Sequence, residues 1–86
     1  MKIDYHKRFK KQFSKLSQKN QKNFEEKLNI FISDTNDIRL SNHCLNGVFD
    51  NCRSINITGD LRAIYTINKN SVYIFLRIGK HSNLYK

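Results

Sequence analysis

The last third of the chain alternates between apolar and polar residues with a period of two. Three segments, 52–57, 61–67 and 71–78, carry β-branched or aromatic side chains at alternate positions. A strand buried on one face requires this period, so the pattern predicts three strands. The intervening residues 58–60 and 68–70 contain glycine, aspartate and asparagine and predict two tight turns. We therefore expect an antiparallel meander.

Strict alternation in the segment 71–78 assigns its residues to two rows. The row expected to face the core contains Val72, Ile74, Leu76 and Ile78, and the outward row contains Tyr73, Phe75 and Arg77. The strand is expected to end near residue 78 and to continue into a loop containing Gly79. Because Asp60 precedes the neighbouring strand, one edge of the sheet would bring together a carboxylate, Arg77, Lys80 and His81.

The first half of the chain changes from a period of two to helical spacing. Residues 2–5 alternate and predict a first strand, paired with the distant meander. Apolar residues then recur four and three positions apart in two stretches, Phe9, Phe13 and Leu16, and Phe24, Leu28 and Phe31. These stripes predict two amphipathic helices joined by the polar residues 17–23.

Residues 34–51 have weak periodicity, and we expect a connection that contains at most a short strand. The element order is then β-α-α-β-β-β. We predict one α+β domain over residues 1–86, with two layers: an antiparallel sheet and an N-terminal helical hairpin packed on one of its faces.

The most informative feature of the composition is its excess of basic residues. Sixteen Lys and Arg residues oppose seven Asp and Glu residues, which gives a net charge of +9 and a pI of about 9.8. Such a field favours nucleic acid, an acidic protein or an anionic lipid surface. The outer face of the first helix carries Lys7, Lys10 and Lys11, which we interpret as contacts for RNA phosphates. A solvated basic face is the alternative, and a membrane contact is disfavoured because the apolar stripe is needed to cover the sheet.

Several other classes of protein are not indicated. The chain has no apolar run near the roughly 18 residues of a transmembrane helix and no signal peptide, so a cytoplasmic protein with no membrane partner is expected. Cys44 and Cys52 are eight residues apart in the sequence, which is not a zinc-binding spacing, and we expect reduced thiols and no metal or other cofactor.

The residues that remain for chemistry are histidine, aspartate and arginine on a basic scaffold. RNA cleavage without a metal needs these types: a base removes the 2′-OH proton, an acid protonates the leaving oxygen and a cation stabilises the phosphorane. Histidine suits either proton role because its pKa lies near neutrality.

Short motifs in a fixed order carry a resemblance over about residues 43–86. They are Leu45-x-Gly47, Cys52-Arg53-Ser54-Ile55, Gly59-Asp60-Leu61-Arg62-Ala63-Ile64-Tyr65 and Arg77-x-Gly79-x-His81-Ser82-x-Leu84-Tyr85. This set resembles the RelE/ParE toxin superfamily, and within it the YafQ-type mRNA interferases of type II toxin–antitoxin systems.

The resemblance implies a RelE-like fold and a toxin that acts as a ribosome-dependent endoribonuclease. Such a toxin enters the A site of the 70S ribosome and cuts translated mRNA, and an acidic antitoxin neutralises it in a hetero-oligomer. A ParE-like inhibitor of DNA gyrase and a non-catalytic nucleic-acid-binding module are the alternatives. His81 favours the RNase, because the gyrase-directed branch usually lacks a histidine there.

The resemblance also implies roles for individual residues. His81 is the main proton-transfer residue, Arg77 stabilises the phosphate, and Asp60 and His43 complete the catalytic set. The expected substrate-binding residues are Tyr85, Asn56, Lys80 and Arg62, together with the three lysines of the first helix.

The chain departs from its relatives at two positions. Asn56 stands where close relatives often have a second active-site histidine, and Leu61 stands where some have tryptophan. Asparagine cannot exchange a proton near neutral pH, so the proton transfers would depend on His81, His43 and Asp60. The alternatives without chemistry are that Asp60 caps a turn, that His43 is solvated and that Arg77 forms a structural ion pair with Asp60.

Overall fold

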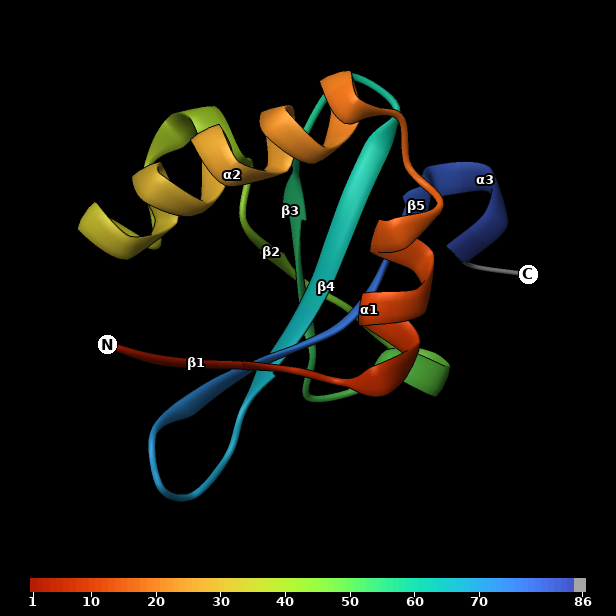
Figure 1. Cartoon of the computed structure of the whole chain (residues 1–86). Helices are drawn as coiled ribbons and strands as arrows, with labels where there is room; N and C mark the ends of the chain where they lie inside the picture. The colour runs from red at the N-terminus through yellow and green to blue at the C-terminus, as the bar shows by residue number, and fades with distance from the viewer. Residues whose placement is uncertain (85–86) are drawn as a thin grey trace.

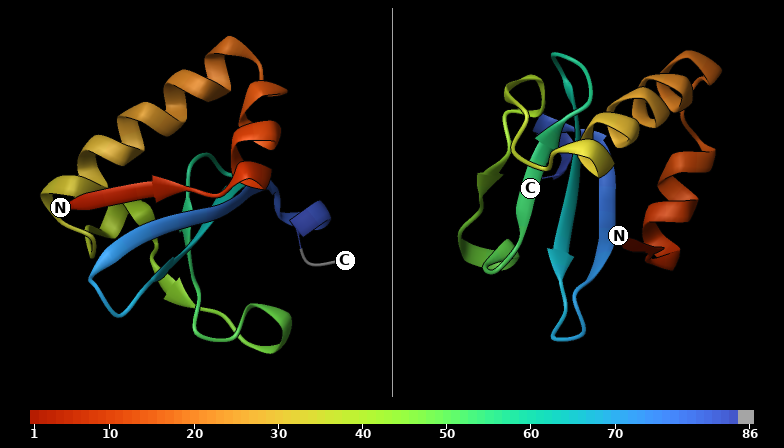
Figure 2. Two further views of the ribbon diagram at one scale, coloured as in Figure 1. Left: turned by 60° about the horizontal axis from the view of Figure 1, so that its bottom comes forward. Right: turned by 90° about the vertical axis from the view of Figure 1, so that its left-hand side faces the viewer.

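The strands form one mixed sheet in the order β1-β5-β4-β3-β2, and two helices cover one of its faces (Figures 1 and 2). The structure, a computed structural model, describes residues 1–84. The strands are β1 (Lys2–Tyr5), β2 (His43–Cys44), β3 (Arg53–Asn56), β4 (Leu61–Ile67) and β5 (Val72–Lys80). The helices are α1 (Lys7–Ser14), α2 (Gln18–Ser33) and α3 (His81–Leu84), and the 3₁₀ turns are η1 (Ile38–Leu40) and η2 (Gly47–Phe49).

The predicted α+β fold with a helical hairpin on one face of the sheet is confirmed, with one difference in strand direction. Strands β3, β4 and β5 form the antiparallel meander, and β2 is the short strand of the long connection. However, β1 pairs with β5 in parallel, with Ile3 opposite Tyr73 and Tyr5 opposite Phe75. Alternation shows which residues share a face but not the direction of a distant partner strand, so a purely antiparallel sheet is wrong.

Helix α2 is longer than its apolar stripe indicates. The prediction that residues 17–23 form a connection is wrong, because α2 begins at Gln18. The Ser17 hydroxyl accepts a hydrogen bond from the Asn20 N–H at 3.1 Å and caps the first turn. Gln21 closes the join between the helices by donating from Nε2 to the backbone oxygen of Phe13 at 3.1 Å.

A β-bulge in β5 changes which of its residues face the helices. Ile64 of β4 lies opposite Arg77, but the next residue, Tyr65, lies opposite Phe75, so Leu76 has no partner of its own. One extra residue reverses the alternation beyond it. Phe75 is consequently fully buried in the core, and Arg77 shares the opposite face with Ile64. The prediction that Phe75 and Arg77 share one face is therefore wrong.

Aromatic side chains fill the space between the helices and the sheet. The ring of Phe75 lies 5.8 Å from that of Phe9 in α1 and 5.5 Å from that of Phe24 in α2. Phe31 packs edge-on against Tyr65, with 4.9 Å between ring centroids. Tilted and edge-on arrangements are the favourable ones for aromatic pairs. The Phe9–Phe75 contact fixes α1 against β5, and this packing positions the site.

We call the face of the sheet opposite α1 and α2 the distal face. The register of β3, β4 and β5 places on it the side chains of Ser54, Asn56, Arg62, Ile64 and Arg77. Ser54 and Ile64 are fully buried there, so the distal face is partly covered rather than open to solvent.

Candidate active site

A cleft of about 480 Å³ lies at the edge of the sheet where α1, β5, η2 and α3 meet. Its walls are formed by Arg8, Gln12, Asn46, Val48, Phe49, Arg77, Asn83 and Leu84. We call it the Arg77 cleft. Three regions that are distant in the sequence contribute to it, namely α1, the segment around η2, and β5 with the α3 that directly follows it. Two arginines supply its positive charge.

Arg77 provides the inner charge of this cleft. Its side chain is half-buried, and its Nη1 donates a hydrogen bond to the backbone oxygen of Leu76 at 2.7 Å. Burial lowers the pKa of the Arg77 guanidinium, and the nearby charge of Arg8 lowers it further. Within residues 1–84 no carboxylate lies at ion-pair distance from Arg77, so the structural pair with Asp60 is wrong. A partly desolvated cation without a counterion is suited to binding an anion.

A second cleft, of about 340 Å³, adjoins the first along α1 and α3. Gln12, Asn83 and Leu84 line both clefts, and the second one also contains Asp60 and Lys80. The structure therefore brings Arg77, Asp60 and Lys80 to the walls of two neighbouring clefts.

His81 directly follows β5 and begins α3. Its backbone N–H donates a hydrogen bond to the backbone oxygen of Asp60 at 3.0 Å, and its side chain is exposed. The predicted loop around Gly79 is wrong, because Gly79 is paired with Arg62 inside the sheet. A Cβ atom on Gly79 would lie 3.3 Å from Cδ2 of Leu84, so the absence of a side chain lets α3 fold closely over β5.

Comparison with known proteins shows the family to which this arrangement belongs. A family model described as the bacterial toxin of type II toxin–antitoxin systems, YafQ, matches residues 1–86. The chain belongs to the YafQ toxin family. A search of curated protein sequences found no match.

Solved structures of YafQ and RelE proteins have the same fold as this YafQ-family chain. YafQ from Escherichia coli is 22% identical, with a TM-score of 0.80 over 98% of this chain and 97% of that one. A structure of the E. coli DinJ–YafQ complex gives 24% identity and a TM-score of 0.77, with 98% and 97% coverage. The RelE–RelB complex of the archaeon Pyrococcus horikoshii gives 22% identity and a TM-score of 0.75, with 95% and 96% coverage.

Two of the predicted substrate-binding residues of this YafQ-family toxin face other surroundings. Arg62 donates from Nη1 to the backbone oxygens of Thr58 and Gly59 at 2.9 and 3.0 Å, so its guanidinium holds the β3–β4 turn. Asn56 lines a crevice with Lys27 and Arg39 rather than the Arg77 cleft. Its Oδ1 is buried without a hydrogen-bond partner among the described residues.

Of the two remaining candidates, His43 lines neither of the two clefts and Tyr85 lies outside the described residues. His43 is exposed on the edge strand β2, and its Nδ1 lies 2.8 Å from the backbone oxygen of Ser41. The cross-strand row runs from His43 through Ser54 and Ile64 to Arg77. Three strand spacings of about 4.8 Å therefore separate the backbones of His43 and Arg77 by roughly 14 Å. The predicted role of Tyr85 lies outside residues 1–84.

The three candidate lysines of α1 are exposed and point to two different surfaces. Lys7 and Lys11 line a crevice of about 510 Å³ with His6 and Arg8. Lys10 instead lies beside an apolar groove between the two helices. The structure therefore separates Lys10 from the other two lysines.

Sequence reasoning missed the contribution of α1 and η2 to the cleft. Neither Arg8 nor Gln12 stands out in the sequence, because Arg8 is one of several cations of the first helix and Gln12 is a single polar residue. Phe49 lies in the long connection whose weak periodicity gave no signal. The one sign in the sequence is that Gln12 directly precedes Phe13 of the apolar stripe. Its half-buried state is visible only in the structure.

Neither a metal cluster nor a membrane span occurs in the described part of the chain. No group of three or more His, Cys, Asp or Glu residues within residues 1–84 could hold a metal ion. No helix there is long and apolar enough to cross a membrane. Both cysteines are free thiols, and burial raises the pKa of Cys52.

Proposed function

We propose that this YafQ-family toxin cuts mRNA on the 70S ribosome by metal-independent acid–base chemistry and thereby inhibits translation. The observation that carries the proposal is the state of Arg77: a half-buried cation in a cleft, with no carboxylate partner within residues 1–84. A phosphate is the anion that such a group binds in a basic protein of net charge +9.

The reaction is a transesterification within the RNA strand. The ribose 2′-oxygen attacks the neighbouring phosphorus and loses its proton to a base, while the bond to the 5′-oxygen of the next nucleotide breaks and an acid protonates that oxygen. The products are a 2′,3′-cyclic phosphate and a 5′-hydroxyl. His81 takes one proton-transfer role and Asp60, held beside it, takes the other, while Arg77 stabilises the charge on the phosphorane.

His43 has a different place in this proposal. Its backbone lies three strands from that of Arg77. We therefore assign it to a neighbouring part of the RNA rather than to the two proton transfers. Lys80 lies beside Asp60 and adds positive charge next to the reacting group.

The expected protein partner is a cognate acidic antitoxin. DinJ–YafQ and RelE–RelB are complexes of relatives, and the charge of this chain favours an acidic partner in a hetero-oligomer. Contact with ribosomes requires that the toxin acts in the cytoplasm.

Induced expression of the chain in a bacterium tests the proposal. Wild type should halt protein synthesis and leave new 5′-ends inside translated reading frames, and His81→Ala should relieve both effects. An mRNA whose start codon is removed is the control, because a ribosome-dependent enzyme leaves it intact. Normal protein synthesis with abundant soluble wild type would refute the proposal. DNA breaks with an SOS response would instead indicate a gyrase inhibitor.

A further inference from the structure

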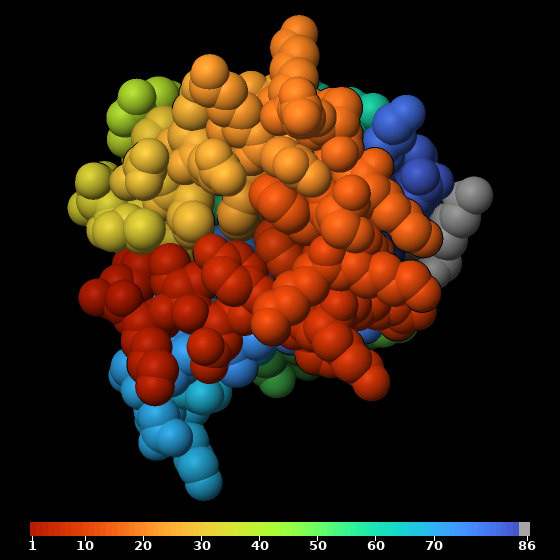
Figure 3. All heavy atoms as spheres, viewed as in Figure 1, coloured from red at the N-terminus to blue at the C-terminus, as the bar shows by residue number. Residues whose placement is uncertain are grey.

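Arg8 is the residue that joins the Arg77 cleft to the outer surface of α1. It lines that cleft and also the crevice formed with His6, Lys7 and Lys11. Arg8, Lys7 and Lys11 consequently form a continuous basic path from the cleft outward. In Figure 3 the atoms of α1 (orange) adjoin those of α3 (blue) at one edge of the molecule, and no element crosses the visible surface of α1.

The two arginines of the cleft differ in burial. Arg77 is half-buried, whereas Arg8 is exposed at the rim. Their charges repel, since the charge of Arg8 lowers the pKa of Arg77, and no carboxylate within residues 1–84 compensates either guanidinium. An inner and an outer cation of this kind match two successive phosphates of one strand that leaves the cleft.

Gln12 links the two elements that carry these cations. It lies one turn after Arg8 on α1, and its Oε1 accepts a hydrogen bond from the Ile78 N–H of β5 at 2.9 Å. Ile78 is the residue next to Arg77. This bond therefore ties the helix that carries Arg8 to the strand that carries Arg77, in addition to the packing of Phe9 on Phe75.

We propose that Arg8 binds the backbone phosphate adjacent to the one held by Arg77, so that single-stranded RNA leaves the cleft across α1 toward Lys7 and Lys11. Gln12 is a positioning residue that holds Arg8 at the required separation from Arg77. The inference rests on the proposed function and specifies the path of the RNA in the same site.

A binding experiment tests the phosphate contact without requiring cleavage. The probe is a short 2′-O-methylated single-stranded RNA, which cannot be cut because its 2′-oxygen is blocked. Arg8→Ala should weaken binding by about 3- to 10-fold, the scale of one charge-assisted contact. The slope of log K against log salt should become shallower by about 0.7, the value for one phosphate on a single strand.

Lys22→Ala is the matched control, because Lys22 is an exposed cation on α2 and lines none of the clefts described above. It should change neither the affinity nor the salt slope beyond experimental error. If Arg8→Ala and Lys22→Ala behave alike, the inference is wrong.

Single-turnover cleavage of ribosome-bound mRNA separates binding from chemistry. Arg8→Ala should raise the toxin concentration that gives half the maximal rate and leave the maximal rate nearly unchanged. A fall in the maximal rate alone would overturn the assignment to the adjacent phosphate. If wild type binds the probe through Arg8 but cuts no mRNA, the RNase proposal fails while the phosphate contact stands. If wild type cuts and Arg8→Ala has no effect, only the present inference fails.

A double-mutant cycle tests the positioning role of Gln12. Gln12→Leu removes the acceptor for Ile78 and should raise the half-saturating concentration in the wild-type background. In the Arg8→Ala background the same substitution should have little further effect, because Gln12 acts through Arg8. Equal losses in both backgrounds would show that Gln12 only stabilises the fold.

Discussion

The backbone N–H of His81 donates a hydrogen bond to the backbone oxygen of Asp60, with 3.0 Å between nitrogen and oxygen. The bond connects the end of β5 to the β3–β4 turn, where the Thr58 hydroxyl accepts from the Leu61 N–H at 3.0 Å. It uses only main-chain atoms of Asp60, so the carboxylate stays available for another task. The position of His81 and the chemistry of the Asp60 side chain can therefore be tested separately.

Asp60→Asn removes the carboxylate and retains the backbone bond. If Asp60 takes part in proton transfer, we expect single-turnover cleavage to fall by about 10²-fold or more, and His81→Gln should cost about 10²- to 10⁴-fold. The measurement is the cleavage rate of ribosome-bound mRNA as a function of pH. An Asp60→Asn enzyme as fast as wild type would restrict Asp60 to holding the turn, and full activity of His81→Gln at every pH would disprove the site.

Arg77 tests the role of a planar guanidinium in the cleft. Arg77→Ala should reduce the maximal cleavage rate by about 10²-fold or more, the scale of losing one transition-state donor. Arg77→Lys retains a charge but not the two parallel donors, so we expect partial activity. Urea unfolding of both variants serves as the control for folding. A wild-type rate for Arg77→Ala in a folded protein would contradict the role of Arg77 at the phosphate.

The regular elements of this fold were predictable from the spacing of apolar residues, and the irregular ones were not. The three meander strands and the stripe of Phe9, Phe13 and Leu16 follow directly from periods of two and of three to four. The bulge at Leu76 has no local signature, because Phe75 and Leu76 are both apolar and either could face the core. Only the pairing with β4 decides between them.

The site was predictable only where short motifs carry it. Strand alternation already predicted that Asp60, Arg77 and His81 gather at one edge of the sheet, and the family resemblance gave them their expected roles. The structure places Asp60 and Arg77 on adjoining clefts. Arg8 and Gln12 reach the same region because Phe9 packs on Phe75, which is distant in the sequence. Such a tertiary contact is not visible in the periodicity of either segment.

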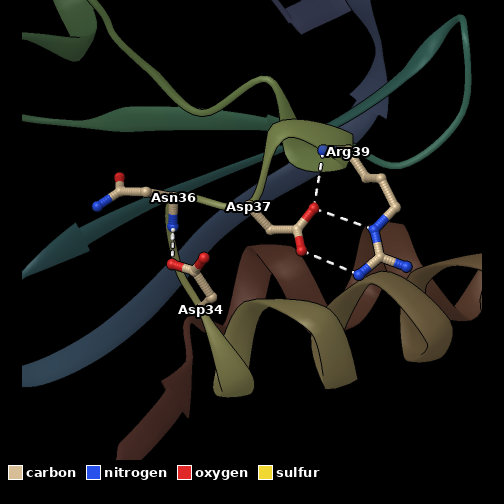
Figure 4. A network of polar contacts seen from close by, with 4 residues as sticks. All are labelled: Asp34, Asn36, Asp37 and Arg39. Carbon is tan, nitrogen blue, oxygen red and sulfur yellow. Dashed lines mark hydrogen bonds and ion pairs between the residues drawn. The ribbon is translucent and has the colours of Figure 1, made fainter.

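An ion pair whose effect on stability depends on pH joins Asp37, the N-cap of η1, to Arg39 within this turn (Figure 4). Arg39 donates from Nε and Nη2 to the two carboxylate oxygens of Asp37, at 3.0 and 2.9 Å. Mainly because of this side-chain hydrogen bonding, the pKa of Asp37 falls from 3.8 to about 2. Because the pKa of Asp37 is lower in the folded state, its ionised form stabilises the fold at pH values above the pKa in the unfolded chain. This stabilisation is lost as the pH falls through the pKa in the folded state.

Asp37→Asn should therefore be slightly less stable than wild type at neutral pH, and the difference should disappear between pH 3.8 and about 2. Urea midpoints measured across this range provide the test, and the effect should be small because the pair lies near the surface. Asp34→Asn is the matched control: Asp34 accepts a hydrogen bond from the Asn36 N–H at 3.0 Å but forms no ion pair. A difference for Asp37→Asn that persists unchanged near pH 2 would contradict the role of the ion pair.

The basic surface of α1 gives a prediction for ribosome association. Lys7 and Lys11 share a crevice with Arg8, whereas Lys10 borders the apolar groove beside Phe13 and Glu25. The double change Lys7→Glu and Lys11→Glu should weaken association by about 10-fold or more and make the salt slope shallower by about 1 to 2, because two phosphate contacts are lost. As single changes, Lys7→Glu and Lys11→Glu should each weaken association more than Lys10→Glu, although all three change the charge of the helix by the same amount.

Affinity of the full toxin for 70S ribosomes, measured at several salt concentrations, distinguishes a contact from a general charge effect. If only the total charge matters, the loss of affinity should depend on the number of substitutions and not on their position. The reason is that exposed charges of one helix contribute similarly to the long-range field. If the lysines contact phosphates directly, the loss of affinity should depend on which side of α1 carries the substitution. Equal salt slopes for wild type and the Lys7/Lys11 variant would show that this side of α1 is only a solvated face.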